Sequence, residues 1–316
     1  MTVADMQRGE GDPSGIGRRG AFSSARSAGD AGARAFPSAR PEAGGYGLAP
    51  ALLIPLQPPV RAMRSVSILG VRFDALSTAA AADQILDWAR AGEGRSVCFS
   101  NAHGVIESQD DPAVDRALNG ADLNVPDGMS IVREMRARGL DQRDRVYGPD
   151  ATLAVAERCA AEGLPVAFYG SSPAVLAALV DRLPEAVPGL DIAAAISPPF
   201  RPLSDEEDEA FVQQLRASGA RGVFVGLGCP RQERWCTEHA SRVGAVCLGV
   251  GAAFDFHAGL LRQAPRVLQQ AGLEWAFRLA MEPRRLWKRY SRVVPRFLIR
   301  TAKERRRLPP MTPSAA

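Results

Sequence analysis

Two polar residues, Asn101 and Asp127, follow successive short apolar runs, and a carboxylate in such a place can do acid–base chemistry. Asn101 follows the run 96–99, and Asp127 follows the run 122–125. If both runs are parallel strands, these residues lie at the sheet edge where ligands bind. Asp127 could then be a general base. It could equally cap the helix that follows it, but two polar strand ends in succession favour a site.

Two glycine-containing turns follow other apolar runs. Gly170 and Ser171 lead from one run into a helix start, where a bound phosphate or a simple serine cap would fit. The second turn, Gly226-Leu-Gly228, has the first two glycines of the dinucleotide fingerprint, but Arg231 stands at the third. It is therefore weak as an NAD motif. It is a reasonable loop for presenting Gln232 and backbone N–H groups to a nucleotide.

A third turn, 249–251, precedes Asp255, which could bind ribose or sugar hydroxyls or cap a helix. The three histidines, His103, His239 and His257, are far apart and lack metal-ligand spacing, so we predict no metal and no cofactor. The five cysteines form no Cys-x-x-Cys pair, which indicates reduced thiols.

Short apolar runs alternate with amphipathic patterns over most of the chain. Expected strands are 65–74, 96–99, 122–125, 165–169, 191–196, 222–226 and 245–249; expected helices are 78–90, 112–119, 128–138, 151–161, 174–183, 204–217 and 231–241. This order predicts an α/β fold: a Rossmann-like parallel sheet with helices on both faces. We expect residues 1–62 and 309–316 to be disordered, 63–272 to form the body, and 273–308 a C-terminal amphipathic helical appendage.

The net charge of +4 hides a strong asymmetry. Residues 65–277 carry nineteen Arg against twenty-eight acids, giving −9, whereas residues 278–307 carry twelve basic residues against two acids, giving +10. No run of about 18 apolar residues occurs, so a spanning helix is not expected. The composition fits a soluble protein, and we expect it in the cytoplasm.

The basic segment 282–303 has a helical pattern that Pro295 should kink or divide. One face carries Leu286, Trp287, Tyr290, Val293, Val294, Phe297 and Leu298, and the other carries six basic residues. This is typical of a helix that binds an anionic membrane surface. Two alternatives are a helix docked on the body with a solvated basic face and, less favoured, a nucleic-acid contact; we expect no nucleic acid partner.

Several stretches in this order resemble the bacterial WecG/TagA/CpsF family of glycosyltransferases. They are Asn101-Ala, 122–128, Arg145-Val-Tyr-Gly148, Tyr169-Gly170-Ser, Gly226-Leu-Gly228-Cys-Pro-Arg-Gln232-Glu, 251–255, 258–259, 262–265, 272–278, Glu282-Pro-Arg-Arg285 and Arg289-Tyr290. The resemblance covers about residues 66–298. It implies an inverting enzyme that moves a sugar from a UDP-sugar to a polyprenyl-diphosphate-linked saccharide, without a metal. It also implies a peripheral location on the inner face of the cytoplasmic membrane, in cell-surface polysaccharide synthesis.

The resemblance further assigns roles to single residues. Asp127 becomes the base that deprotonates the acceptor hydroxyl, and Asn101 helps to hold that site. Arg145 and Gln232 match positions implicated in substrate binding, while Arg278 and Arg285 match arginines thought to approach the diphosphate. Phe99 stands where the family usually has Thr, so the donor or acceptor could differ. Two rival functions are a nucleotide-dependent oxidoreductase and a non-enzymatic nucleotide- or lipid-binding protein. A homo-oligomer is also possible.

Overall fold

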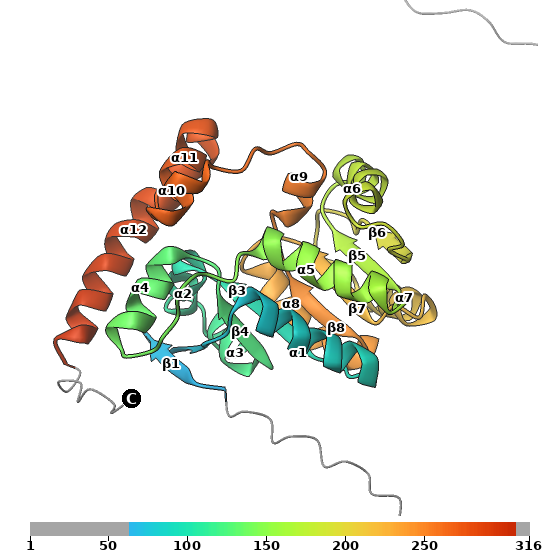
Figure 1. Ribbon diagram of the computed structural model, residues 1–316, viewed down its shortest axis with the longest axis horizontal. Coiled ribbons are helices and arrows are strands. Elements are labelled where there is room, and N and C mark those ends of the chain that lie inside the picture. The colour runs from blue at the N-terminus through green and yellow to red at the C-terminus, as the bar shows by residue number, and fades with distance from the viewer. Residues whose placement is uncertain (1–62, 308–316) are drawn as a thin grey trace, which may run out of the picture. The chain divides into compact units, whose positions relative to one another are not determined.

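A computed structural model describes residues 63–307, and a six-stranded parallel sheet runs through it (Figure 1). The strands lie in the order β4 (Leu123–Pro126), β3 (Ser96–Ser100), β8 (Val246–Gly249), β7 (Gly222–Gly226), β5 (Val166–Gly170) and β6 (Ile192–Ile196). All neighbouring pairs are parallel. β3 is the first of these six strands along the chain, and β8 is the last. Because the two are neighbours in the sheet, their C-terminal ends lie side by side. The predicted α/β fold is confirmed.

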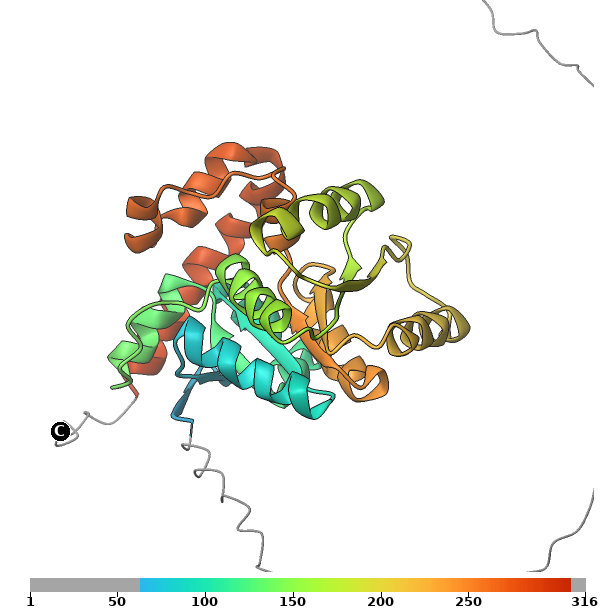
Figure 2. The same cartoon turned by 45° about the vertical axis from the view of Figure 1, so that its right-hand side comes forward.

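Helices cover both faces of this sheet, as the alternating strand–helix pattern predicted (Figure 2). They are α1 (Thr78–Ala91), α2 (Ala102–Ser108), α3 (Pro112–Gly120), α4 (Met129–Ala137), α5 (Gly148–Ala161), α6 (Pro173–Ala186), α7 (Asp205–Ala217), α8 (Arg231–Val243), α9 (Ala253–His257), α10 (Arg266–Gln270), α11 (Glu274–Met281) and α12 (Pro283–Arg305). Five of these helices, α1, α2, α3, α6 and α7, begin after a residue whose side chain accepts a hydrogen bond from the first turn. The start of α7 is a capping box in which Ser204 and Glu207 bond reciprocally.

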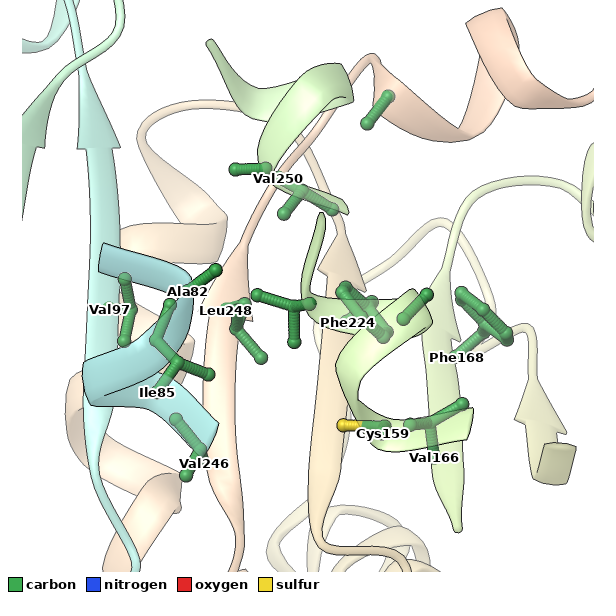
Figure 3. Close-up of a cluster of buried hydrophobic side chains, with 14 of the residues drawn as sticks. Ala82, Ile85, Val97, Cys159, Val166, Phe168, Phe224, Val246, Leu248 and Val250 are labelled. Carbon is green, nitrogen blue, oxygen red and sulfur yellow. The ribbon is translucent and has the colours of Figure 1, made fainter. Parts of the chain in front are cut away.

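The core divides into layers because successive strand side chains point to opposite faces of the sheet. On one face Val166, Phe168, Phe224 and Leu248 pack with buried side chains of α1, α5 and α6, as Figure 3 shows in part. On the other face Tyr169, Val223 and Val225 pack with α7 and α8. This two-sided burial explains why the strands of the sheet are mostly apolar. Asn124, inside β4, is a buried polar exception.

The expected first strand, 65–74, is wrong in one respect: it is a hairpin. β1 (Ser65–Ile68) and β2 (Val71–Asp74) pair antiparallel and form a separate two-stranded sheet. Leu69 and Gly70 both have positive φ, 51° and 86°, which turns the chain tightly enough to fold the run back on itself. The hairpin packs beside β4, where Asn124 donates its side-chain amide to the Arg72 carbonyl at 2.7 Å.

The C-terminal helix α12 is docked on the body. Leu286, Val293, Phe297 and Thr301 are buried, and Val293 and Phe297 belong to a core cluster that also contains residues of α2, α3 and α4. The predicted single apolar face is therefore split, because Trp287 and Leu298 are 66% and 60% exposed. The burial of Leu286, Val293 and Phe297 agrees with the alternative in which the helix docks on the body. Pro295 does not divide the helix, which continues through it.

The basic face of α12 is also partly neutralised by the body. Arg292 and Arg296 both pair with Asp110, which follows α2. A separate ion pair, from Arg138 at the end of α4 to Glu304 of α12, attaches the helix through its acidic residue. None of the helices in residues 63–307 combines the length and apolar character needed to cross a bilayer. The predictions for residues 1–62 and 309–316 lie outside the described residues.

Candidate active site

The ends of β3 and β4 bring Asn101 and Asp127 together, as the sequence predicted. The Asp127 N–H donates to the Ser100 carbonyl at 2.9 Å, which continues the parallel pairing past the strand end. The Asn101 side-chain amide donates to Asp127 Oδ2 at 3.3 Å, while its oxygen caps α2 by accepting from the His103 N–H. Asn101 thus fixes one oxygen of the carboxylate and the start of a helix with a single side chain.

The second oxygen of Asp127 is held by the start of α5. The Gly148 N–H donates to Oδ1 at 2.8 Å, so the carboxylate faces the positive end of a fourteen-residue helix. Glycine suits this position, because a Cβ would lie 3.3 Å from the Val250 carbonyl oxygen, a tight contact. Asp127 is not the cap of the helix that follows it: the N-cap of α4 is Gly128, and the helix has no side-chain cap.

Opposing effects set the ionisation of Asp127. Burial raises its pKa above the ordinary aspartate value, as does the charge of Glu274 to a smaller degree. The Gly148 N–H, the charge of Arg145 and the Asn101 amide lower the pKa. The net pKa is raised, which makes the carboxylate a stronger base than a solvated aspartate. This balance suits a residue that must accept a proton from a hydroxyl.

Arg145 lies beside this carboxylate but is engaged by other groups. Its Nη1 pairs with Glu274 Oε2 at 2.5 Å, its Nη2 donates to Gln269 Oε1 at 2.9 Å, and its guanidinium lies 3.7 Å from the centre of the Tyr147 ring. The two partners Gln269 and Glu274 come from α10 and α11. The structure thus brings Arg145 near Asp127, and its predicted contact with a substrate stays a prediction.

Gln232 joins two strand exits. Its side-chain oxygen accepts from the Gly228 N–H at 3.0 Å, and its side-chain nitrogen donates to the Gly249 carbonyl at 2.7 Å. A Cβ at Gly251 would lie 2.9 Å from the side-chain oxygen of Gln232. Packing therefore explains one glycine of the 249–251 turn. The amide is therefore used inside the protein in this structure, and its predicted role with a nucleotide is untested.

Glu233, next to Gln232, is a buried carboxyl that the sequence reasoning did not single out. Its Oε1 accepts from the Gln232 amide at 3.1 Å, whereas Oε2 has no hydrogen-bond partner within the described residues. Burial raises its pKa to about 7, and the charge of Asp127 adds to the rise. A glutamate immediately after Gln232, in the first turn of α8, looks like an ordinary helix-start acid, so nothing in the spacing indicated burial.

Gly170 and Ser171 form a tight turn at the end of β5. Gly170 has φ 118°, and a Cβ on it would lie 2.7 Å from the carbonyl carbon of Gly226. Ser171 has φ 61°, and its N–H donates to the Gly226 carbonyl at 2.9 Å. Ser172, rather than Ser171, caps α6. Gly170 therefore permits close approach of two strand ends, and the strained Ser171 backbone is the part of this turn that points to function.

A further group of predicted residues gathers around α9. Asp255 is half-buried, and burial raises its pKa while the charges of Arg285 and Arg278 lower it. The Arg278 guanidinium lies 5.8 Å from the centre of the Phe256 ring, and Arg285 pairs with Glu282. These residues come from α9, α11 and α12, so the fold assembles a polar group across segments about thirty residues apart. Among residues 63–307 no three His, Cys, Asp or Glu side chains are grouped as metal ligands.

The predicted residues thus form three neighbouring groups rather than one. Asn101, Asp127 and Arg145 meet at the exits of β3 and β4; the β5 and β7 turns carry Gly170, Ser171, Gly228 and Gln232; Asp255 meets Arg278 and Arg285 at α9. Comparison with protein families gives one result that spans all three: residues 66–310 match the family described as "Glycosyl transferase WecG/TagA/CpsF family".

Proposed function

The chain belongs to the WecG/TagA/CpsF family of glycosyltransferases, which act in cell-surface polysaccharide synthesis, and on that premise we propose that Asp127 is its catalytic base. The observation that carries the proposal is the geometry of this carboxylate. It is oriented by one amide and one helix N-terminus, and its pKa is raised by burial. We propose a UDP-sugar as donor and a polyprenyl-diphosphate-linked saccharide as acceptor.

The reaction is a direct displacement. Asp127 accepts the proton of an acceptor hydroxyl, and the oxygen forms a bond to the anomeric carbon of the donor. The bond between that carbon and the β-phosphate oxygen breaks, and UDP leaves with the electron pair. Because attack and departure occur on opposite sides of the carbon, the product has inverted anomeric configuration. Asn101 holds the carboxylate while its charge changes.

Positive groups near α9 suit the departing diphosphate. The influence of Arg278 and Arg285 on Asp255 indicates that both cations lie close to this half-buried carboxyl. Arginine donates two parallel hydrogen bonds to phosphate oxygens and stabilises charge that develops on a leaving group. We propose that these arginines do so for UDP without a metal ion. Turnover that persists in excess EDTA is the expected result.

Membrane contact is supported by the exposed part of the C-terminal helices. Trp287, Leu298 and Ile299 are largely exposed on α12, and Val267, Leu273 and Met281 are exposed on the segment before it. Basic residues, including Lys288 on α12, accompany these apolar side chains. An exposed apolar strip with cations binds anionic membranes. We propose that α10–α12 bring the enzyme to the inner face of the cytoplasmic membrane, where a prenyl-anchored acceptor resides.

The test is transfer by the purified full-length protein from a panel of UDP-sugars to lipid-linked saccharide acceptors. Asp127→Asn should lower kcat by roughly 10²- to 10⁴-fold. Asp181→Asn is the matched control, because Asp181 is exposed on α6. Binding of UDP with no turnover across the panel would favour a binding protein, and selective binding of NAD would favour the oxidoreductase. Full activity of Asp127→Asn would reject the proposed base.

A further inference from the structure

Glu274, the first residue of α11, makes two polar contacts next to Asp127. Its Oε2 pairs with Arg145 at 2.5 Å, and its Oε1 accepts from the Tyr147 hydroxyl at 2.9 Å. The side chains of Glu274 and Arg145 are only 13% and 9% exposed. One carboxylate from the C-terminal helices therefore holds two residues of the segment that leads into α5.

That segment is directly connected to Asp127. The Val146 N–H, which lies between the two held residues, donates to the Pro126 carbonyl at 2.7 Å. The next residue after Tyr147 is Gly148, whose N–H donates to Asp127 Oδ1. A displacement of Arg145 and Tyr147 would therefore move the hydrogen-bond donor that fixes the carboxylate.

We infer that Glu274 is a positioning residue, which clamps Arg145 and Tyr147 beside Asp127 and so makes the seating of α11 a condition for catalysis. This inference rests on the proposed role of Asp127 as the base. No described residue of α11 is fully buried. Its Trp275 ring contacts Tyr290 of α12, and Glu274 supplies its ion pair with the segment beside Asp127. Arg133 adds one more, from its guanidinium to the Ala271 carbonyl before α11. Arg145 then acts mainly through Asp127 rather than on a substrate.

The charges around Asp127 give the clamp a signature that a purely structural ion pair lacks. The titratable and charged groups that face Asp127 are Arg145, Tyr147, Glu274 and Glu233. Arg145 lowers the pKa of Asp127, and Glu274 raises it. Tyr147 remains a protonated donor, because burial and the neighbouring carboxylates raise its own pKa. Removing Arg145 should therefore raise the pKa of Asp127, and removing Glu274 should lower it.

The pH dependence of kcat/KM tests this directly. Its acid limb follows ionisation of the base in the free enzyme. Glu274→Gln should move the acid limb to lower pH, because the charge that raises the pKa is removed. Arg145→Gln should move it to higher pH. Glu304→Gln, which removes a carboxylate that holds α12 through Arg138, should leave the limb in place. Limbs that stay at the wild-type pH in both clamp variants would overturn the inference.

A second measurement does not depend on turnover. Trypsin cleavage within 262–278 reports how often the α10–α11 segment leaves the body. Glu274→Ala should speed this cleavage by about a hundredfold, because it removes both the ion pair with Arg145 and the acceptor of the Tyr147 hydroxyl, and Glu304→Gln should not. Unchanged cleavage would reject the clamp even if transfer is confirmed. Faster cleavage in a protein whose Asp127→Asn variant stays active would instead support the clamp and reject the proposed base.

Discussion

Helices α11 and α12 follow each other in the chain, yet they are attached to the body in different ways. α12 buries Leu286, Val293, Phe297 and Thr301, and its arginines pair with Asp110. α11 has no fully buried side chain among its residues, all of which are described, and it is held by Glu274. One helix is fastened mainly by apolar burial, and the other by a carboxylate next to Asp127.

This difference separates stability from function. Buried apolar side chains contribute free energy to the whole fold, because removing them leaves a cavity in a shared core. A polar contact at the edge contributes less and can break without unfolding the body. We therefore regard α12 as part of the fold, and α11 as a segment whose position can respond to what occupies the site.

The largest expected effect tests the apolar attachment of α12. Phe297→Ala should lower the free energy of unfolding by about 3–5 kcal/mol, because Phe297 is 3% exposed and packs into the cluster with α2, α3 and α4. Its neighbour Leu298, 60% exposed, is the matched control, and Leu298→Ala should change stability by less than about 0.5 kcal/mol. Urea denaturation followed by circular dichroism measures both. Equal losses would show that α12 is not docked through this face.

The exposed strip of α12 should matter for membranes and little for stability. Trp287→Ser is expected to weaken binding to anionic lipid vesicles by roughly tenfold or more, since a buried large apolar side chain contributes about 1.5–3 kcal/mol. Co-sedimentation with vesicles containing phosphatidylglycerol measures this, and neutral vesicles provide the comparison. Undiminished vesicle binding together with a large loss of stability would mean that Trp287 belongs to the docked face.

The sequence could predict most of the strands and helices because their signals are local. Apolar runs bounded by Gly, Ser and Asp gave six strands of the sheet within one or two residues, and the polar ends of two of them correctly brought Asn101 and Asp127 together. The hairpin was missed because residues 65–74 also suit a single strand. Only the positive φ of Leu69 and Gly70 reveals the turn.

The contacts that complete the site have no local signal. Arg145 and Glu274 are 129 residues apart, and only the docking of α11 shows that they pair. The same limit applies to α12. An apolar helical face predicts that the face is buried, but it does not say whether protein or lipid covers it. The structure shows only that the face is divided: Phe297 packs on protein and Trp287 is exposed.

A smaller change sharpens the comparison on the side of α11. Tyr147→Phe removes the hydroxyl that donates to Glu274 and leaves the ring under the Arg145 guanidinium. Hydrogen bonds to charged groups contribute about 1.5–3 kcal/mol, so trypsin cleavage within 262–278 should rise by at least about tenfold. Cooperative unfolding in urea should change much less than in Phe297→Ala. A large loss of global stability instead would show that α11, like α12, is part of the cooperative core.

The smallest expected effect concerns the ion pairs of α12. Asp110→Asn removes the shared partner of Arg292 and Arg296, and these pairs are partly exposed. Exposed ion pairs contribute about 0–1 kcal/mol and are screened by salt. The free energy of unfolding should therefore fall by less than about 1 kcal/mol at low salt and by less at high salt.

The two arginines keep the pKa of Asp110 well below its usual range, so protonation near neutral pH does not release them. The substitution should free Arg296 and leave Arg292 with its longer contact to Glu107 at 3.5 Å. Binding to anionic vesicles should then strengthen, because each added cation near such a surface contributes about 1 kcal/mol. If vesicle binding weakens instead, the Asp110 pairs hold α12 in the orientation that exposes Trp287, and the ion pairs would count with the buried side chains as part of its attachment.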